Sequence, residues 1–198
     1  MEKREKPRKE TVYSAFKIIL KVVLSVFAIA FAITIMIIIR NFSWQYVKED
    51  NLNIHYNKMS RECFAAHYEW DGNPENMTIT VPDECDGLKV KSLGGFTAAP
   101  TLFYVMVPDK MHPEAVSVAE DIKHIGTIDK NTVTYTFTVK LGKNIRDPER
   151  FTYKEYYMDD SGKVIYIVEM NYESSPENKW IYSENGKLYD KKTNKLIE

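Results

Sequence analysis

The chain has 198 residues and a net charge of −1 at pH 7, which is enough sequence for one ordinary domain and a membrane segment. This balance excludes a general attraction to nucleic acid, and no cluster of basic and aromatic side chains indicates RNA or DNA binding. The charges are nevertheless uneven, because residues 1–40 contain eight Lys or Arg and three Glu, or +5, which leaves −6 for the rest. A basic N-terminal segment followed by an acidic remainder indicates that these two parts of the chain lie in different compartments.

An apolar run occupies residues 22–39, where Ser25 and Thr34 are the only polar side chains. As a helix it spans about 27 Å, close to the ~30 Å hydrocarbon core of a bilayer. We therefore expect a basic cytoplasmic tail over residues 1–16 and a single transmembrane helix in contact with lipid over residues 17–40. Since basic side chains snorkel and aromatic ones prefer the interface, the expected interface anchors are Lys17, Lys21, Arg40, Phe42, Trp44 and Tyr46.

Two other interpretations of this run are weaker. A buried core helix rarely runs this long without a charge, and the small pair Ala28 and Ala30, which a signal peptidase would need, lies inside the apolar run. An uncleaved signal anchor is favoured, and the positive-inside rule then places the N-terminus in the cytoplasm and the C-terminal domain outside the cell membrane. Ala28 and Ala32 have a spacing that lets two helices approach closely, which leaves a homo-oligomer open.

The region after the helix is expected to contain a juxtamembrane stalk over residues 41–62 and a β-rich extracytoplasmic domain over residues 63–198. Short β-branched segments bounded by turn residues predict strands over 77–81, 88–93 and 101–107. Residues 112–126 are ambiguous. Pro113 and Gly126 suit the start and the end of a helix of about ten residues.

Residues 131–142 form the clearest strand pattern in the chain. Strict alternation places four threonines on one face and, on the other, Val133, Tyr135, Phe137 and Val139. Two more strands are expected around the turn sequence Asp-Asp-Ser-Gly at 159–162, and a hairpin around Asn185 and Gly186. The predicted fold class is mainly β (α+β), with one N-terminal helix.

Three segments share a repeat-like pattern. Residues 78–95, "TITVPDECDGLKVKSLGG", place a β-branched run and Val-Pro before an acidic turn and an apolar-x-apolar-x-x-apolar segment. Residues 139–145 and 173–197 carry related patterns, "VKLGKNI" and "ESSPENKWIYSENGKLYDKKTNKLI". Together they resemble the bacterial-surface (BspA-type) leucine-rich repeat family. The resemblance implies a small, degenerate repeat-like domain that binds a protein, a glycan or a cell-wall component without catalysing a reaction.

The two cysteines, Cys63 and Cys85, are open to more than one interpretation. A disulfide between them would close a loop of about 22 residues and stabilise the fold by about 3 kcal/mol, whereas two separate thiols would pack as small apolar groups. Zinc binding by both cysteines and His67 would need a fourth ligand that no motif supplies. The sequence therefore predicts no metal site, no cofactor and no assembled catalytic set.

The alternative to a binding module is a membrane-anchored enzyme, or an accessory subunit of one, with its site in residues 97–130. This region matches no part of the repeat pattern and contains His112 and His124. The enzyme hypothesis would gain if these histidines lay with a carboxylate in a concave pocket, and would lose if they were scattered over the surface.

Overall fold

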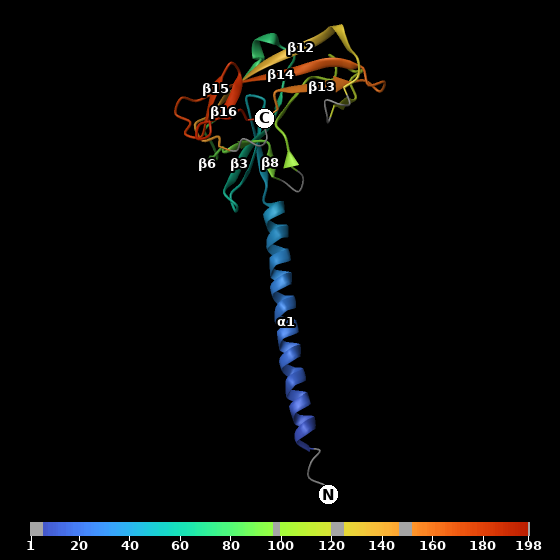
Figure 1. Ribbon diagram of the computed structural model, residues 1–198, viewed down its shortest axis with the longest axis vertical. Helices are drawn as coiled ribbons and strands as arrows, with labels where there is room; N and C mark the ends of the chain where they lie inside the picture. Colours follow the sequence, from blue (N-terminus) through green and yellow to red (C-terminus); the bar gives the residue numbers. More distant parts are fainter. Residues whose placement is uncertain (1–5, 97–99, 120–124, 147–151, 198) are drawn as a thin grey trace. The chain divides into compact units, whose positions relative to one another are not determined.

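The computed structural model describes residues 6–96, 100–119, 125–146 and 152–197. It divides the chain into two compact units, Met1–Ser43 and Trp44–Glu198 (Figure 1). The first unit contains α1 (Lys6–Phe42), in which Phe16–Ile39 is long and apolar enough to cross a membrane. The hydroxyls of Ser25 and Thr34 each donate to the carbonyl four residues earlier at 2.9 Å, so the helix itself satisfies both polar side chains.

The second unit is built on two five-stranded sheets. In the first sheet, β3 pairs antiparallel with β2 on one edge and parallel with β7 and β10 on the other. The strand β1 completes this sheet beyond β2. The bounds of these strands are β1 (Gln45–Glu49), β2 (Leu52–Asn57), β3 (Glu62–Glu69), β7 (Ser92–Leu93) and β10 (Tyr104–Met106).

The second sheet has the order β11-β13-β14-β12-β4, and β12 runs parallel to both of its neighbours, β14 and β4. Its strands are β4 (Thr78–Thr80), β11 (Ser117–Val118), β12 (Ile128–Leu141), β13 (Lys154–Met158) and β14 (Val164–Ser174). Smaller elements are η1 (Pro74–Asn76), β5 (Glu84–Cys85) with β6 (Leu88–Lys89), β8 (Gly95–Phe96) with β9 (Pro100–Thr101), and β15 (Ile181–Glu184) with β16 (Lys187–Asp190).

A single large core joins the two sheets. From β12, the fully buried side chain of Phe137 meets Trp70 edge-on, with ring centroids 5.4 Å apart, and meets Tyr68 of β3 at 6.4 Å. Edge-to-face pairs of this kind add about 0.5–1.5 kcal/mol each to the burial of the rings. The alternation predicted for β12 is therefore confirmed at Phe137 and Val139, although Val133 on the same face is exposed.

Two of the three repeat-like segments lie side by side as the parallel strands β4 and β12, and the third begins at the end of β14 and continues into the β15–β16 hairpin. Ile79 of β4 is in register with Val139 of β12, which is in register with Tyr172 of β14. All three side chains are buried. The hairpin predicted around Asn185 and Gly186 is also confirmed, because both residues have positive φ, 51° and 76°, and β15 pairs antiparallel with β16.

The structure differs from the sequence-based expectation in one segment and resolves an ambiguity in another. The stalk predicted over residues 41–62 is replaced by β1 and β2, and Leu52 and Ile54 are part of the core. The β-rich unit therefore begins at Trp44 rather than at residue 63. The helix considered within residues 112–126 is absent from the described part of that segment, because Ser117 and Val118 form β11 and pair with β13.

We predict that a fragment starting at Cys63 will not fold, whereas one starting at Trp44 will. The shorter fragment loses Leu52 and Ile54 from the core and leaves one edge of β3 without its antiparallel partner, a loss expected to exceed the 5–15 kcal/mol stability of an ordinary domain. Far-UV circular dichroism and urea unfolding of both fragments provide the measurement. A cooperative transition in the shorter fragment would show that residues 44–62 are dispensable.

Candidate functional site

A groove of about 620 Å³ lies between the edge strand of the first sheet, β10, and the edge strand of the second sheet, β11. A volume of this size is typical of small-molecule sites. One side is formed by Leu102, Tyr104, Met106, Val107 and Asp109, and the other by Ala115, Val116, Ser117 and Val118. Strands β13 and β14 contribute Glu155, Tyr157 and Tyr166.

The rim of the groove is apolar although it is accessible to solvent. The side chains of Leu102 and Val116, from its two sides, are 54% and 57% exposed, and Met106 is 45% exposed. A continuous patch of large apolar side chains around a concave surface is typical of a binding site.

Glu155 is the buried polar group of this groove. Only 9% of the residue is exposed, and this burial raises the pKa of its carboxyl to about 7, against the partial opposing effect of a hydrogen bond from Tyr157. Alternation along β13 turns both residues toward the same side of the sheet. Near neutral pH, Glu155 is therefore poised between its neutral and its charged form.

The hydroxyl of Tyr157 has two acceptors and one hydrogen. It lies 3.2 Å from the carboxylate of Glu155 and 3.2 Å from the backbone carbonyl of Val105. A phenol donates a single hydrogen bond. When Glu155 is neutral, its carboxyl O–H can donate a hydrogen bond to the oxygen of Tyr157, while the hydroxyl of Tyr157 donates to the carbonyl of Val105. When Glu155 is charged, the two acceptors compete for one hydrogen.

Stacked rings form the wall behind this carboxyl. Tyr157 and Tyr166 stack with centroids 4.4 Å apart, and Tyr166 also stacks with His112 at 4.6 Å. The imidazole Nε2 of His112 lies 2.8 Å from the hydroxyl of Tyr135. Burial raises the pKa of Tyr157 and Tyr166, so the wall is made of neutral phenols.

Part of the region 97–130 therefore lies at the groove. Within it, His112 reaches the groove wall through Tyr166, and its carboxylate neighbour is the half-exposed Glu114 at 3.4 Å rather than Glu155. His124 lies outside the described residues. Sequence reasoning missed Glu155, Tyr157 and Tyr166, which the fold brings to this region from β13 and β14.

Cys63 and Cys85 are both buried and lie next to each other as free thiols. Burial, with a further contribution from Cys85, raises the pKa of the Cys63 thiol to about 12, so this cysteine is a poor nucleophile. His67, considered with them as a zinc ligand, stacks on Tyr104 at 5.1 Å and lies 3.6 Å from Glu69. Among the described residues, no group of three His, Cys, Asp or Glu side chains could hold a metal ion.

The expected membrane-interface anchors fall in both units. Lys17 and Lys21 are exposed on α1, whereas the side chains of Arg40 and Phe42 lie outside those that the structure describes. Trp44 packs edge-on against Phe64 of β3, with centroids 5.3 Å apart, and Tyr46 is 75% exposed on β1. Trp44 therefore belongs to the β-rich unit rather than to the helix.

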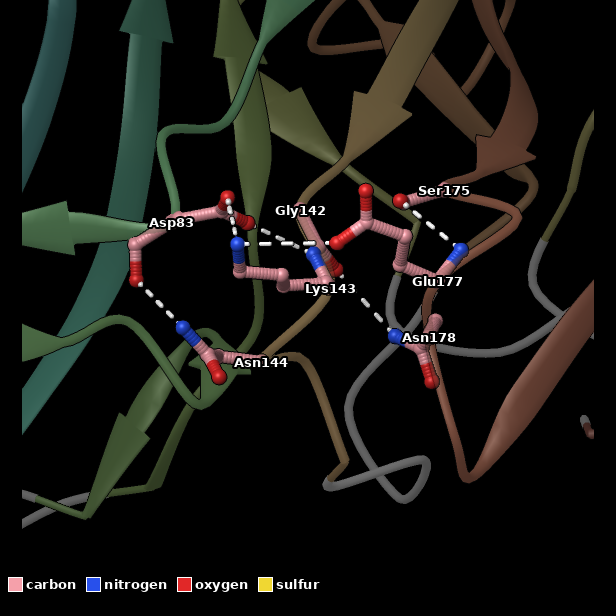
Figure 2. Close-up of polar contacts among 7 residues, drawn as sticks. All are labelled: Asp83, Gly142, Lys143, Asn144, Ser175, Glu177 and Asn178. Carbon is pink, nitrogen blue, oxygen red and sulfur yellow. Dashed lines mark hydrogen bonds and ion pairs between the residues drawn. The ribbon is translucent and has the colours of Figure 1, made fainter.

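A polar cluster at the ends of the parallel strands is structural. Figure 2 shows Lys143 between the carboxylates of Asp83 and Glu177, with its ammonium 3.6 Å from each. The backbone N–H of Lys143 also donates to Asp83 at 2.6 Å. Because these charges compensate each other at the surface, we infer that their role is to hold three loops together. Exposed ion pairs of this kind contribute about 0–1 kcal/mol each.

The buried side chain of Asn178 continues this cluster inward. Its amide donates to the carbonyls of Gly142, at 3.1 Å, and Ile145, at 2.8 Å. Its oxygen accepts from the backbone N–H groups of Trp180 and Ile181. All four hydrogen bonds that an amide side chain can make are formed, so Asn178 fastens the end of β12 to the start of β15.

Comparison with protein-family models, with curated proteins and with solved structures found no match to this chain.

We predict that Glu155→Gln will stabilise the β-rich unit at alkaline pH but not at acidic pH. The pKa of Glu155 is raised from 4.5 to about 7, so the folded state binds more protons than the unfolded state between these values. Stability is therefore lost as the pH rises through this window, and the loss reaches about 3 kcal/mol above pH 7. Glutamine keeps the shape without the charge.

Urea unfolding of the wild type and Glu155→Gln from pH 4 to pH 8 measures this difference, with the exposed Glu184→Gln as the matched control. The Glu155 variant should gain stability progressively over the wild type, while the control should follow the wild type. A constant difference across this range would show that Glu155 does not titrate between these values.

Proposed function

We propose that this protein is a single-pass membrane protein whose β-rich domain lies outside the cytoplasm and acts as a non-catalytic binding module. The observation that carries the proposal is the groove, which combines an exposed apolar rim, an aromatic wall and one buried carboxyl. Sites of this composition bind ligands by burial of apolar area and gain specificity from a few polar groups.

The apolar helix supports the membrane part of the proposal. No residue of the apolar window within Phe16–Ile39 is buried in the protein, which suits contact with lipid rather than a place in a protein core. The excess of Lys and Arg in residues 1–40 supports a cytoplasmic N-terminus by the positive-inside rule. The domain beginning at Trp44 would then lie on the other side of the membrane.

The parallel stack of β4, β12 and β14 supports a repeat-like domain. Strands β4 and β12 carry two of the three segments that resemble the BspA-type leucine-rich repeat, and the third segment begins at the end of β14. The buried residues Ile79, Val139 and Tyr172 are in register across these three strands. Stacked parallel strands followed by turns are the architecture of solenoid repeats. We propose a degenerate stack of this kind, with a protein, glycan or cell-wall component as its partner.

A second candidate is a membrane-anchored enzyme or accessory subunit with its site in residues 97–130. Glu155 lies outside this range but lines the same groove as residues 102–118, and a carboxyl with a pKa of about 7 suits proton transfer at neutral pH. Against it, His112 bonds Tyr135 and Glu114 rather than Glu155. Binding requires fewer assumptions than a reaction does, so we rank the binding module first.

The topology predicts a specific protease pattern. With the N-terminus in the cytoplasm, protease added to intact cells should degrade the β-rich domain and spare a tag fused before Met1. Immunoblotting for tags at both ends measures this, and permeabilised cells provide the control in which both tags are lost. Loss of the N-terminal tag in intact cells would reverse the orientation.

The binding role predicts that a charge at the rim will block the groove. Leu102→Arg should reduce retention of the natural partner by the domain at least tenfold, because an apolar contact area is replaced by a cation. The partner is captured from the envelope fraction of the source cells, and Met59→Arg, at an equally exposed position outside the groove, is the matched control. Equal capture by both variants would place the binding surface elsewhere.

A further inference from the structure

We propose that the groove binds a small organic cation, an ammonium group with an apolar substituent, and that the ammonium lies at the carboxylate of Glu155. The substituent would lie against the aromatic wall and the apolar rim. This inference rests on the proposed binding function and specifies the chemical class of its ligand.

The charges of the groove select a cation. Glu155 and Asp109 are acidic, and within the described part of the chain none of the residues that line the groove is basic. An anionic ligand would be repelled by these two carboxylates, and a neutral ligand would leave the negative charge of Glu155 uncompensated. An ammonium group compensates a carboxylate in a region of low dielectric constant, where the attraction between opposite charges is strong.

The hydrogen bonds of Tyr157 favour an ammonium group in particular. Its single hydrogen cannot serve both charged Glu155 and the carbonyl of Val105. An ammonium group has up to three donors and no acceptor. One of these donors can bond Glu155, which leaves Tyr157 free to donate to Val105, so the ligand completes the network instead of competing with it.

The apolar part of the ligand is matched by a rigid wall. Tyr157 and Tyr166 hold each other in a stack with an interplanar angle of 13°, and Tyr104 is held by its stack on His67. Side chains that are already fixed lose little entropy when a ligand binds. The exposed rim of Leu102 and Val116 provides further apolar area for the substituent.

Binding should depend on pH because the ammonium needs a charged Glu155. Among the residues that the structure describes, the titratable groups around this carboxyl are phenols and one further acid, namely Tyr104, Tyr157, Tyr166, Tyr172 and Asp109. Burial raises the pKa of Glu155 to about 7, while an alkylammonium stays protonated to about pH 10. Affinity should therefore fall at least tenfold between pH 8 and pH 5.5.

The test uses the full chain in nanodiscs of zwitterionic lipid, with 4-phenylbutylamine as the probe. Its neutral and anionic analogues, 4-phenylbutan-1-ol and 4-phenylbutyrate, have the same apolar part. Ligand-observed NMR measures binding, and empty nanodiscs provide the correction for partition into lipid. At pH 8 the amine should bind at least tenfold more tightly than the alcohol, and the carboxylate should bind most weakly.

Glu155→Gln should abolish the preference for the amine and its pH dependence, whereas Glu184→Gln should keep both. Equal binding of amine and alcohol to the wild type, or an unchanged preference in Glu155→Gln, would overturn the proposal. The proposed binding module is tested separately by Leu102→Arg, which blocks ligands of any charge. If that variant loses its partner while the amine shows no preference, only the class of ligand is wrong.

Discussion

The β-rich domain depends on the pairing of β12, which runs parallel to both β4 and β14. Parallel neighbours cannot be joined by a tight turn, because the chain must return to the starting edge of the sheet. The crossover before β12, residues 81–127, carries β10 and β11, and the crossover after it, residues 142–163, carries β13. The groove is lined mainly by these two crossovers. A topological requirement of the sheet therefore generates the site.

The sequence predicted what local chemistry determines. Strict alternation defined β12, and the positive φ that Asn185 and Gly186 adopt at little cost defined the last hairpin. It failed at β2, where the buried Asn53 and Asn57 made a core strand look like a polar stalk. Asn53 donates to Glu69 at 2.8 Å, and Asn57 accepts from two backbone N–H groups. The partner of Asn53 lies 16 residues away and is brought near only by folding, whereas Asn57 bonds its own turn. Two polar residues that are satisfied in this way can be buried, and composition alone does not show it.

The groove was harder to predict because its burial is non-local. Period-2 alternation places Glu155 and Tyr157 on one face of β13, and a carboxyl beside a tyrosine is also what a half-exposed strand presents. Glu155 is buried where β13 meets β10 and β11, two strands that come much earlier in the chain: β11 pairs with β13, and Tyr157 donates to Val105 of β10. Part of the region 97–130 lines the groove, but the buried carboxyl comes from β13, and His112 contacts Tyr135 and Tyr166 rather than Glu155.

A buried carboxyl of this kind lowers the stability of the free protein. At neutral pH the folded state either keeps a proton on Glu155 or holds a charge that shares one hydrogen of Tyr157 with Val105. Glutamine would fill the same space and avoid both costs, so packing does not explain a glutamate here. Charge recognition does, because a bound cation relieves the desolvation penalty and thereby couples its own affinity to the stability of the domain. The desolvation penalty of Glu155 in the free protein is therefore relieved only by a cationic ligand, and this difference makes the groove selective for cations.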